Sequence, residues 1–318
     1  MTTSAIHGIA AQITEPMLRL WLLLVCSSSL VRAALILPRG RCDVHHPTAL
    51  RTHAISMQEG EPDLPELESE SAVFSDQPPQ VTLVAPAKIN LFLRITRRRD
   101  DGFHELASLF QTVSLFDTLD FWENTQPDAP LCSMEVTRNS LGAELIPTDE
   151  SNLVMRALAL FAERTGETRK IHCRLHKAIP AQGGLGGGSC DAATALFAAN
   201  RMAGYPASQD ELIRWGAELG SDVSFFFSQG SAYCTGRGEI ITPLERPLAP
   251  TVCYLIKPAE GCSTPAVFKA LGLSPDEELD GADPEELLQK FVKGSVYDAE
   301  YINDLEPPAF AVLPSLKQ

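Results

Sequence analysis

Regular alternation of apolar and polar side chains begins near residue 80 and predicts a β-sheet. In residues 81–95 the alternation runs on both sides of Pro86, so we predict a pair of strand segments broken at this proline. Residues 106–121 are also strand-like, and residues 171–175 predict a short strand further along the chain. The globular part of the chain is therefore expected to open with a sheet.

Two polar residues interrupt the apolar pattern of the first predicted strand. Because successive side chains of a strand point to opposite faces, Lys88 and Asn90 share the face opposite to Ile89 and Leu91. A lysine in such a strand is commonly an edge residue, whose stem covers apolar surface while its ammonium reaches water. The pattern alone leaves open whether Lys88 is an edge residue of this kind or a catalytic group.

Three segments show the apolar spacing of helices. Residues 152–164 and 209–219 predict amphipathic helices, the second ending at Gly220, and residues 192–202 predict an alanine-rich helix. Directly after Gly220, Ser221 or Asp222 is suited to cap the N-terminus of a short buried helix, because both side chains accept backbone hydrogen bonds. Capping is thus the structural interpretation of Asp222, and catalysis is the alternative.

A run of glycines precedes the alanine-rich helix and carries the strongest chemical signal. Five glycines stand between Gly183 and Gly188, and glycine lets a backbone approach a ligand closely. The N-terminus of a helix offers free N–H groups and positive potential, so this junction predicts a phosphate-binding loop. No lysine precedes Ser189, which excludes a P-loop, and a serine replaces the last glycine of a dinucleotide fingerprint.

Composition and charge restrict the classes of partner. The chain has 318 residues, of which 44% are hydrophobic, and a net charge of −15. So acidic a protein is poorly suited to bind nucleic acid, and we expect a small-molecule partner instead. The eight cysteines are dispersed without a C-x-x-C pair, which indicates neither a zinc site nor a disulfide framework. Small core residues in a reducing compartment are the expectation.

The first 78 residues have the composition of a targeting leader. Residues 1–33 contain a short apolar run and a small-x-small pattern typical of a cleaved signal, and residues 34–58 resemble a transit peptide. An acidic, proline-bearing linker follows over residues 59–76. We predict delivery to the plastid stroma through the secretory route, with no membrane span in the mature protein. A lone membrane anchor or an incorrect start are the alternatives.

Several motifs in one chain order resemble the galactokinase, homoserine, mevalonate and phosphomevalonate (GHMP) kinase superfamily. Three carry the general resemblance: residues 86–91, 183–189 and 220–222. Three more, residues 101–104, 236–239 and 303–306, are similar to the branch of kinases that act on a cytidine diphosphate-linked methylerythritol in the non-mevalonate isoprenoid pathway. The resemblance covers the chain from about residue 81 to its end.

The resemblance implies a fold and a site. It implies an α+β, two-domain GHMP-kinase fold with the active site in the interdomain cleft, residues 79–250 forming the N-terminal domain and 251–318 the start of the second. Lys88 and Asp222 match the catalytic residues, and Asn90, Phe103 and His104 match those lining the cytidine pocket. ATP, with Mg²⁺ near Ser189, would be bound by the loop residues Pro180, Ala181, Gln182, Gly183, Gly184, Leu185, Gly186, Gly187, Gly188, Ser189 and Cys190.

Two departures from the family pattern leave alternatives open. The family usually has Ser-Asn where this chain has Cys190-Asp191, and a carboxylate near ATP phosphates is unfavourable unless it points away or meets Mg²⁺. The family's third glycine-rich motif has no counterpart before Gln318, so we expect a truncated chain with an incomplete second domain. A nucleotide-binding but inactive protein, or a sister kinase acting on homoserine or mevalonate, are the alternatives to the cytidine-specific kinase.

Overall fold

The structure is a computed structural model that describes residues 19–26, 29–36, 77–181, 183–246, 248–249, 251–257, 260–294 and 296–317. Two strands of the predicted leader, β1 (Arg19–Cys26) and β2 (Ser29–Ile36), form an antiparallel hairpin, and β2 pairs with β9 (Tyr254–Ile256). The rest of the signal-like and transit-like segments lies outside the described residues. Among the helices that are described, none is long and apolar enough to cross a bilayer.

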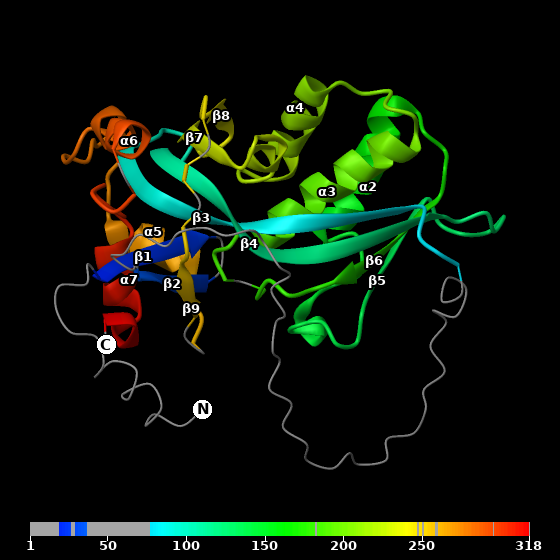
Figure 1. Cartoon of the computed structure of the whole chain (residues 1–318), viewed down its shortest axis with the longest axis horizontal. Coiled ribbons are helices and arrows are strands. Elements are labelled where there is room, and N and C mark those ends of the chain that lie inside the picture. Colours follow the sequence, from blue (N-terminus) through cyan, green and yellow to red (C-terminus); the bar gives the residue numbers. More distant parts are fainter. Residues whose placement is uncertain are drawn as a thin grey trace, which may run out of the picture. The chain divides into compact units, whose positions relative to one another are not determined.

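A six-stranded sheet organises the following residues (Figure 1). Its centre is an antiparallel hairpin of two long strands, β3 (Val81–Arg98) and β4 (His104–Glu123). On the other side of β4 lie β6 (Ile171–His176) and β7 (Ser231–Gly236), both antiparallel to it. The outer strands are β5 (Cys132–Val136), parallel to β6, and β8 (Ile240–Pro243), antiparallel to β7.

Strand β4 shares one edge between two partners. Residues 118–123 pair with β6, and residues 106–111 pair with β7. Within the described sheet, residues 112–117 therefore pair with neither β6 nor β7 on that edge. The chain leaves β6 at this gap and enters the glycine-rich loop, so the split of β4 decides where the loop meets the sheet.

The predicted break at Pro86 is wrong, because β3 runs through it as one strand. The register with β4 shifts between Pro86 and Lys88, which marks a bulge rather than a break. The described part of β3 pairs with β4 alone, apart from isolated bridges at Leu93 and Arg97. The backbone nitrogen of Pro86, which has no hydrogen to donate, can therefore face the unpaired edge of the strand. The chain thus carries Lys88 on a continuous and well-anchored strand.

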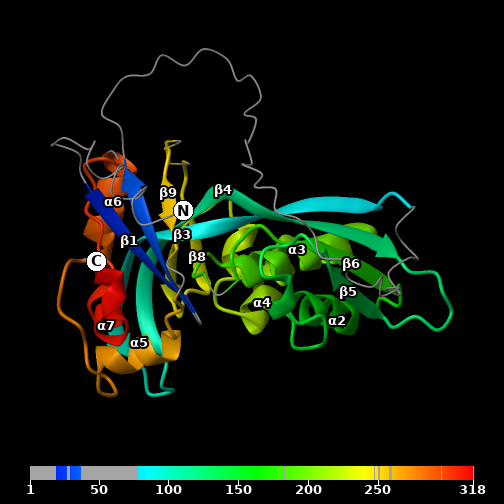
Figure 2. The same ribbon diagram turned by 90° about the horizontal axis from the view of Figure 1, so that it is seen from below.

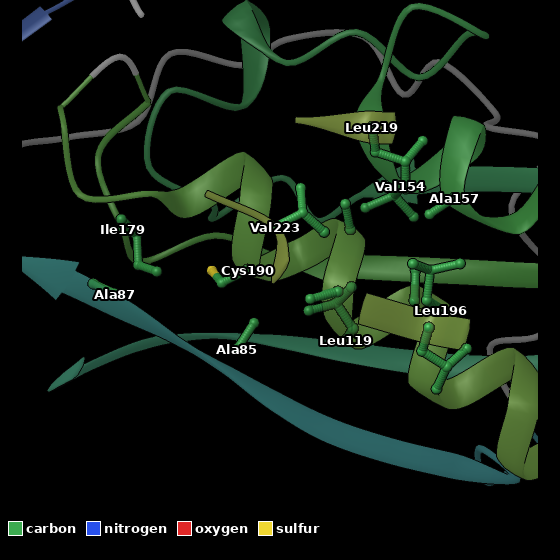
Figure 3. Packing of buried hydrophobic residues seen from close by; sticks show 14 of the residues in the cluster. Ala85, Ala87, Leu119, Val154, Ala157, Ile179, Cys190, Leu196, Leu219 and Val223 are labelled. Carbon is green, nitrogen blue, oxygen red and sulfur yellow. The ribbon is translucent and has the colours of Figure 1, made fainter. Parts of the chain in front are cut away.

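Three helices cover one face of this sheet (Figure 2). They are α2 (Leu153–Thr165), α3 (Gly187–Met202) and α4 (Gln209–Leu219), which confirms the predicted helices. Side chains stabilise two of their N-termini: Asn152 accepts a hydrogen bond from the Val154 N–H, and Ser208 forms a capping box with Glu211. Figure 3 shows part of the core beneath them, with Ala85 and Leu119 from the strands and Leu196 and Val154 from the helices.

Two local predictions near the glycine loop need correction. Helix α3 begins at Gly187, inside the glycine run, and not at Ala192. The short helix η3 (Ser224–Phe227) starts after Val223 and has no side-chain cap, so neither Ser221 nor Asp222 caps it. Asp222 instead lies in a turn, and its carboxylate contacts the Lys88 ammonium.

The C-terminal segment packs around the far end of β3. It contains α5 (Thr264–Leu271), α6 (Pro284–Lys293), α7 (Glu306–Val312) and η4 (Pro314–Lys317), whereas the short helix η2 (Ala143–Leu145) lies between β5 and α2. A second apolar cluster joins Leu93 and Ile95 to residues of α5 and α7. A buried ion pair adds to it, with Arg94 Nη1 3.1 Å from Asp304 Oδ1, while Asp304 Oδ2 accepts the Ile95 N–H at 2.7 Å.

Candidate active site

Lys88 and Asp222 meet in the structure although 134 positions separate them in the chain. Their Nζ and Oδ2 atoms are 3.3 Å apart, with the lysine side chain 1% exposed and that of Asp222 12%. Lys88 also donates to Asn90 Oδ1 at 2.9 Å, and its ammonium lies 4.1 Å from the centre of the Phe110 ring. The edge-residue interpretation of Lys88 is wrong, because a buried ammonium held by a carboxylate, an amide and a ring face is not solvated.

Asn90 is itself held in place from behind. Its Nδ2 donates to Ser108 Oγ at 2.8 Å, and Ser108 donates in turn to the Phe92 carbonyl at 2.5 Å. This chain of hydrogen bonds fixes which amide atom faces Lys88, so the ammonium meets an acceptor. Asn90, which the resemblance assigns to the substrate pocket, therefore has its described amide groups engaged with Lys88 and Ser108.

The glycine loop rests directly on the Lys88 side chain. The Lys88 N–H donates to the Leu185 carbonyl at 2.9 Å. Gly186 has a φ of +71°, and a Cβ at this position would lie 3.0 Å from Lys88 Cγ and 3.1 Å from Phe226 Cζ. The approach of loop and lysine is therefore possible only with glycine at position 186.

A cavity of about 270 Å³ lies against this loop. Of the residues predicted to bind ATP, Gln182 lies outside the described residues, and Cys190 is buried and does not line the cavity. The others line it: Pro180, Ala181, Gly183, Gly184, Leu185, Gly186, Gly187, Gly188 and Ser189. Helix α3 starts at this wall without a side-chain cap, which leaves the N–H groups of its first turn for a ligand.

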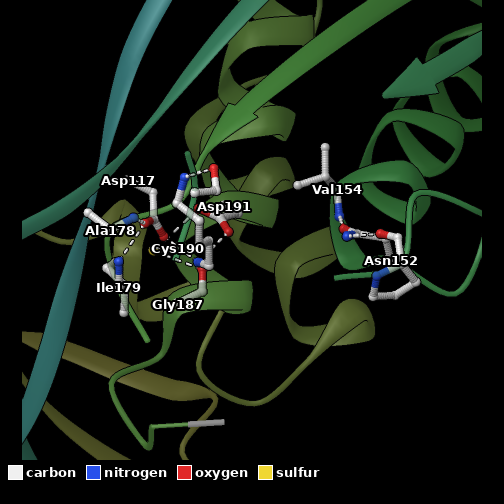
Figure 4. Close-up of polar contacts among 11 residues, drawn as sticks. Asp117, Asn152, Val154, Ala178, Ile179, Gly187, Cys190 and Asp191 are labelled. Atoms are coloured by element: carbon white, nitrogen blue, oxygen red, sulfur yellow. Dashed lines mark hydrogen bonds and ion pairs between the residues drawn. The ribbon is translucent and has the colours of Figure 1, made fainter. Parts of the chain in front are cut away.

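Beneath the loop lies a buried cluster that sequence reasoning did not single out. Lys177 forms an ion pair with Asp117 and a second with Asp191, whose Oδ2 is 2.8 Å from the Lys177 ammonium. All three side chains are at most 5% exposed. Figure 4 shows Asp117 and Asp191 converging beside Gly187, with the N–H groups of Ala178 and Ile179 directed at Asp117.

Burial and charge have opposite effects within this cluster. Burial raises the pKa of the Asp191 carboxyl, and the charge of Lys177 offsets part of that rise. Burial also disfavours the charged form of Lys177, but the carboxylates of Asp191 and Asp117 outweigh it and raise the pKa of this lysine. Burial raises the pKa of the Cys190 thiol, which donates to the Gly187 carbonyl at 3.0 Å.

The cluster also explains the departure at Asp191. Its carboxylate is buried and contacts the Lys177 ammonium, at the wall of the cavity. Ligand atoms of Asp117, Cys190 and Asp191 lie within 4.8 Å of one another, a spacing that a metal ion could bridge. The Lys177 ammonium already supplies a cation to both carboxylates, so these residues form an ion-pair cluster.

Phe103 and His104 point in different directions from the start of β4. Phe103 is 53% exposed, with the Arg237 guanidinium carbon 5.0 Å from its ring centre. His104 packs its ring 4.8 Å from that of Phe268, a residue of α5 that sequence reasoning missed. Both His104 and Phe268 line a cavity of about 340 Å³. Within the described structure, the buried His104 Nε2 has no hydrogen-bond partner.

The turn between β7 and β8 connects Phe103 with the Lys88–Asp222 pair. This turn contains Arg237, which covers Phe103, and Gly238, at which a Cβ would lie 3.8 Å from Asp222 Oδ1.

Burial lowers the pKa of His104, and the charge of Arg98 lowers it further, so the imidazole is neutral at pH 7. A neutral imidazole packed on the Phe268 ring at the wall of a cavity is suited to contact a flat base.

Comparisons with known proteins agree with this arrangement. Residues 152–230, which include the glycine loop and Asp222, match the family model described as the GHMP kinases N terminal domain. The fold and the site therefore define the class of the GHMP kinases. The chain belongs to the 4-diphosphocytidyl-2-C-methyl-D-erythritol kinase family. It is 44% identical over 237 residues to the kinase of that name from Protochlamydia amoebophila (strain UWE25), covering 74% of this chain and 75% of the relative.

A plant relative and a solved structure extend the comparison. The chloroplastic kinase of the same name from Oryza sativa subsp. japonica is 48% identical over 240 residues, which cover 75% of this chain and 57% of the rice protein. A crystal structure of 4-(cytidine 5'-diphospho)-2C-methyl-D-erythritol kinase has 32% identity and a TM-score of 0.56, and covers 74% of this chain and 80% of that one. The chain spans about three fifths of the length of the plant relatives it matches.

Proposed function

We propose that this protein is an ATP-dependent kinase that phosphorylates the 2-hydroxyl of 4-diphosphocytidyl-2-C-methyl-D-erythritol in the non-mevalonate isoprenoid pathway. The observation that carries the proposal is the buried Lys88–Asp222 pair, 3.3 Å apart, with the glycine loop packed on the lysine stem. Phosphoryl transfer depends on positioning and charge stabilisation, and this pair lies against the loop that leads to the N-terminus of α3, where the structure describes no side-chain cap. Membership of the family supports the choice of substrate.

In the proposed mechanism, Asp222 acts on the acceptor alcohol. The alcohol oxygen attacks the γ-phosphorus and forms an O–P bond, while the bond from the γ-phosphorus to the β–γ bridging oxygen breaks and ADP leaves. The alcohol proton passes to the Asp222 carboxylate, which Lys88 orients through their 3.3 Å contact. The Lys88 ammonium also stabilises the negative charge that develops at the transferred group.

The glycine loop fits the phosphates of ATP. Gly186 and Gly187 pack tightly on the side chains below the loop, because a Cβ would lie 3.0 Å from Lys88 Cγ and 2.9 Å from Lys177 Nζ, respectively. Ser189, in the first turn of α3, lines the cavity and is the residue suited to hold Mg²⁺ together with the phosphates. A bound Mg²⁺ would neutralise part of the negative charge of the phosphates.

The second part of the proposed site binds the cytidine group. His104 and Phe268 line the second cavity, and Phe103 stands beside it under Arg237. Arg237 would then lie between the base and Asp222, where the diphosphate of the substrate joins the nucleoside to the acceptor alcohol. Arginine suits that group because its guanidinium can bind phosphate oxygens bidentately.

A coupled assay of ADP formation tests the proposed function. The chain and the complete gene product would each be purified and given ATP with the cytidine substrate, homoserine or mevalonate. We expect turnover with the cytidine substrate alone. Turnover with homoserine or mevalonate would favour a sister kinase. If the complete gene product binds nucleotide but phosphorylates none of the three alcohols, the alternative of a nucleotide-binding but inactive protein is favoured.

The substitution Phe103→Ala tests the base pocket. Because stacking of a base on an aromatic ring contributes about 1–3 kcal/mol, we expect the KM for the cytidine substrate to rise about tenfold or more. The KM for ATP should stay unchanged. Phe197→Ala, which removes a partly exposed ring from α3, is the matched control. Equal effects of both substitutions on the cytidine KM would contradict a base-binding role for Phe103.

We also propose two points of organisation. Residues 79–250 form the N-terminal kinase domain and residues 251–318 contribute to the second, with the site in the cleft between them; the match of residues 152–230 to the N-terminal domain of the family supports the first of these assignments. Residues 1–78 act as a plastid-targeting leader, supported by the chloroplastic plant relatives. The location of a fluorescent protein fused to these residues tests the leader, and a cytosolic signal would exclude it.

A further inference from the structure

The Asp117–Lys177–Asp191 cluster takes no part in the proposed chemistry, yet it contacts both ends of the glycine loop. Strand β6 ends at His176, opposite Thr118, so Lys177 and Asp117 are the first residues beyond the paired strands. Asp117 pairs with Ala85 of β3 but with no β6 residue on its other edge, where its Oδ1 accepts the N–H groups of Ala178 at 2.7 Å and Ile179 at 2.8 Å. The carboxylate thereby fixes the segment that enters the loop.

The exit of the loop is tied to the same cluster through Lys177. Its ammonium donates to Asp191 Oδ2 at 2.8 Å, joining residues that are 14 positions apart. The ammonium also lies directly under the first residue of α3, because a Cβ at Gly187 would be 2.9 Å from Lys177 Nζ. Entry and exit of the loop are thus held by one buried cation, while the glycines between them have no side chains to fix their path.

The charges of the cluster do not balance. One ammonium faces two carboxylates, and the loop above them is the wall of the cavity that Lys177 and Asp191 both help to line. If Lys177 faced only Asp117, the cluster would be neutral. The Asp117 carboxylate accepts hydrogen bonds from two backbone N–H groups in addition to its ion pair with Lys177. The second carboxylate, Asp191, therefore opposes the positive potential that Lys177 directs at a phosphate bound by the loop.

We propose that Lys177 is a positioning residue for the nucleotide loop, and that Asp191 is a counter-charge that limits nucleotide affinity. This inference rests on the proposed assignment of the loop to ATP phosphates. Lys177 holds the first turn of α3 in the orientation that directs its N–H groups into the cavity. Asp191 secures Lys177 from below, and its negative charge weakens the binding of a polyphosphate. Neither residue contacts the reacting atoms.

The substitution Asp191→Asn tests the counter-charge with little change of shape. The amide oxygen can still accept a hydrogen bond from Lys177, while the negative charge is lost. By calorimetry with ADP on the complete gene product, we expect the Kd to fall by about three- to tenfold. In the kinase assay the KM for ATP should fall likewise, with kcat and the KM for the cytidine substrate unchanged. Asp210→Asn, an exposed acid at the start of α4, is the matched control and should leave the Kd unchanged.

The double substitution Lys177→Met and Asp191→Asn tests the positioning role. Removing Lys177 alone would leave two buried carboxylates without a cation, so the second change removes one of them and keeps the net charge of the cluster as it is in the unsubstituted protein. We expect the Kd for ADP to rise about tenfold or more relative to Asp191→Asn, with the thermal unfolding transition retained. Unchanged ADP binding in both variants would overturn the inference and leave the cluster with a structural role only. Altered ADP binding without turnover of any alcohol would uphold it and reject the proposed kinase activity.

Discussion

Replacing Asp222 by asparagine is expected to lower kcat by about 10²–10⁴-fold while changing the KM for ATP little. The amide keeps the shape of the side chain but cannot accept the alcohol proton, and it no longer neutralises the Lys88 ammonium 3.3 Å away. Steady-state kinetics with the cytidine substrate measure the effect. Because the change also removes the carboxylate that faces the buried Lys88 ammonium, thermal unfolding of the variant should be measured beside the kinetics.

The pH profile of this variant separates two roles of the carboxylate. If Asp222 is the general base, the residual rate of Asp222→Asn should rise with pH, because hydroxide replaces the missing base. If the carboxylate only orients the alcohol, the residual rate should keep the pH dependence of the unsubstituted protein. Asp210→Asn serves again as the control. If kcat of Asp222→Asn equals that of the unsubstituted protein, Asp222 has no role in catalysis.

Periodicity was sufficient to find most elements of the fold and could have found the buried cluster. Side chains of β6 alternate between buried and half-exposed, and Lys177 continues the parity of the inward residues Cys173 and Leu175. Asp117 similarly shares the parity of the buried Leu119 and Phe121 on β4. A charged residue at an inward position requires a partner, so the two residues could have been paired from their register alone.

Other parts of the site depend on tertiary contacts that no local pattern records. Nothing near Phe268 in the sequence indicates that its ring packs on His104, because the contact forms only when α5 meets the start of β4. The sequence shows that Pro86 lacks an N–H and therefore predicts a break in the strand. It does not show that β3 lies at the edge of the sheet, where a strand can contain a proline. Likewise, α3 extends into the glycine run because Lys177 and Leu185 hold the loop on both sides.

The convergence of these contacts on Lys88 makes Gly186 the most sensitive backbone position of the proposed site. We expect Gly186→Ala to lower kcat by up to about 10²-fold, the effect of displacing a catalytic group by about 1 Å, because the Lys88 stem must shift by a few tenths of an ångström and the strained loop with it. The new Cβ would lie 3.0 Å from Lys88 Cγ and 3.1 Å from Phe226 Cζ, so the lysine stem must shift. Positive φ at an alanine also costs about 1–2 kcal/mol of folding stability, which thermal unfolding would detect.

Gly204→Ala isolates the displacement of Lys88 from the backbone strain. Gly204 has a φ of +83°, close to the +71° of Gly186, but a Cβ there would have no neighbour within 4 Å. Both variants should lose about 1–2 kcal/mol of stability from the dihedral, and only Gly186→Ala should also lose kcat. Equal kcat in the two variants would mean that the loop does not position Lys88. A selective loss would show that the glycine run serves catalysis as well as phosphate binding, since the residue that admits the ligand also determines where the lysine lies.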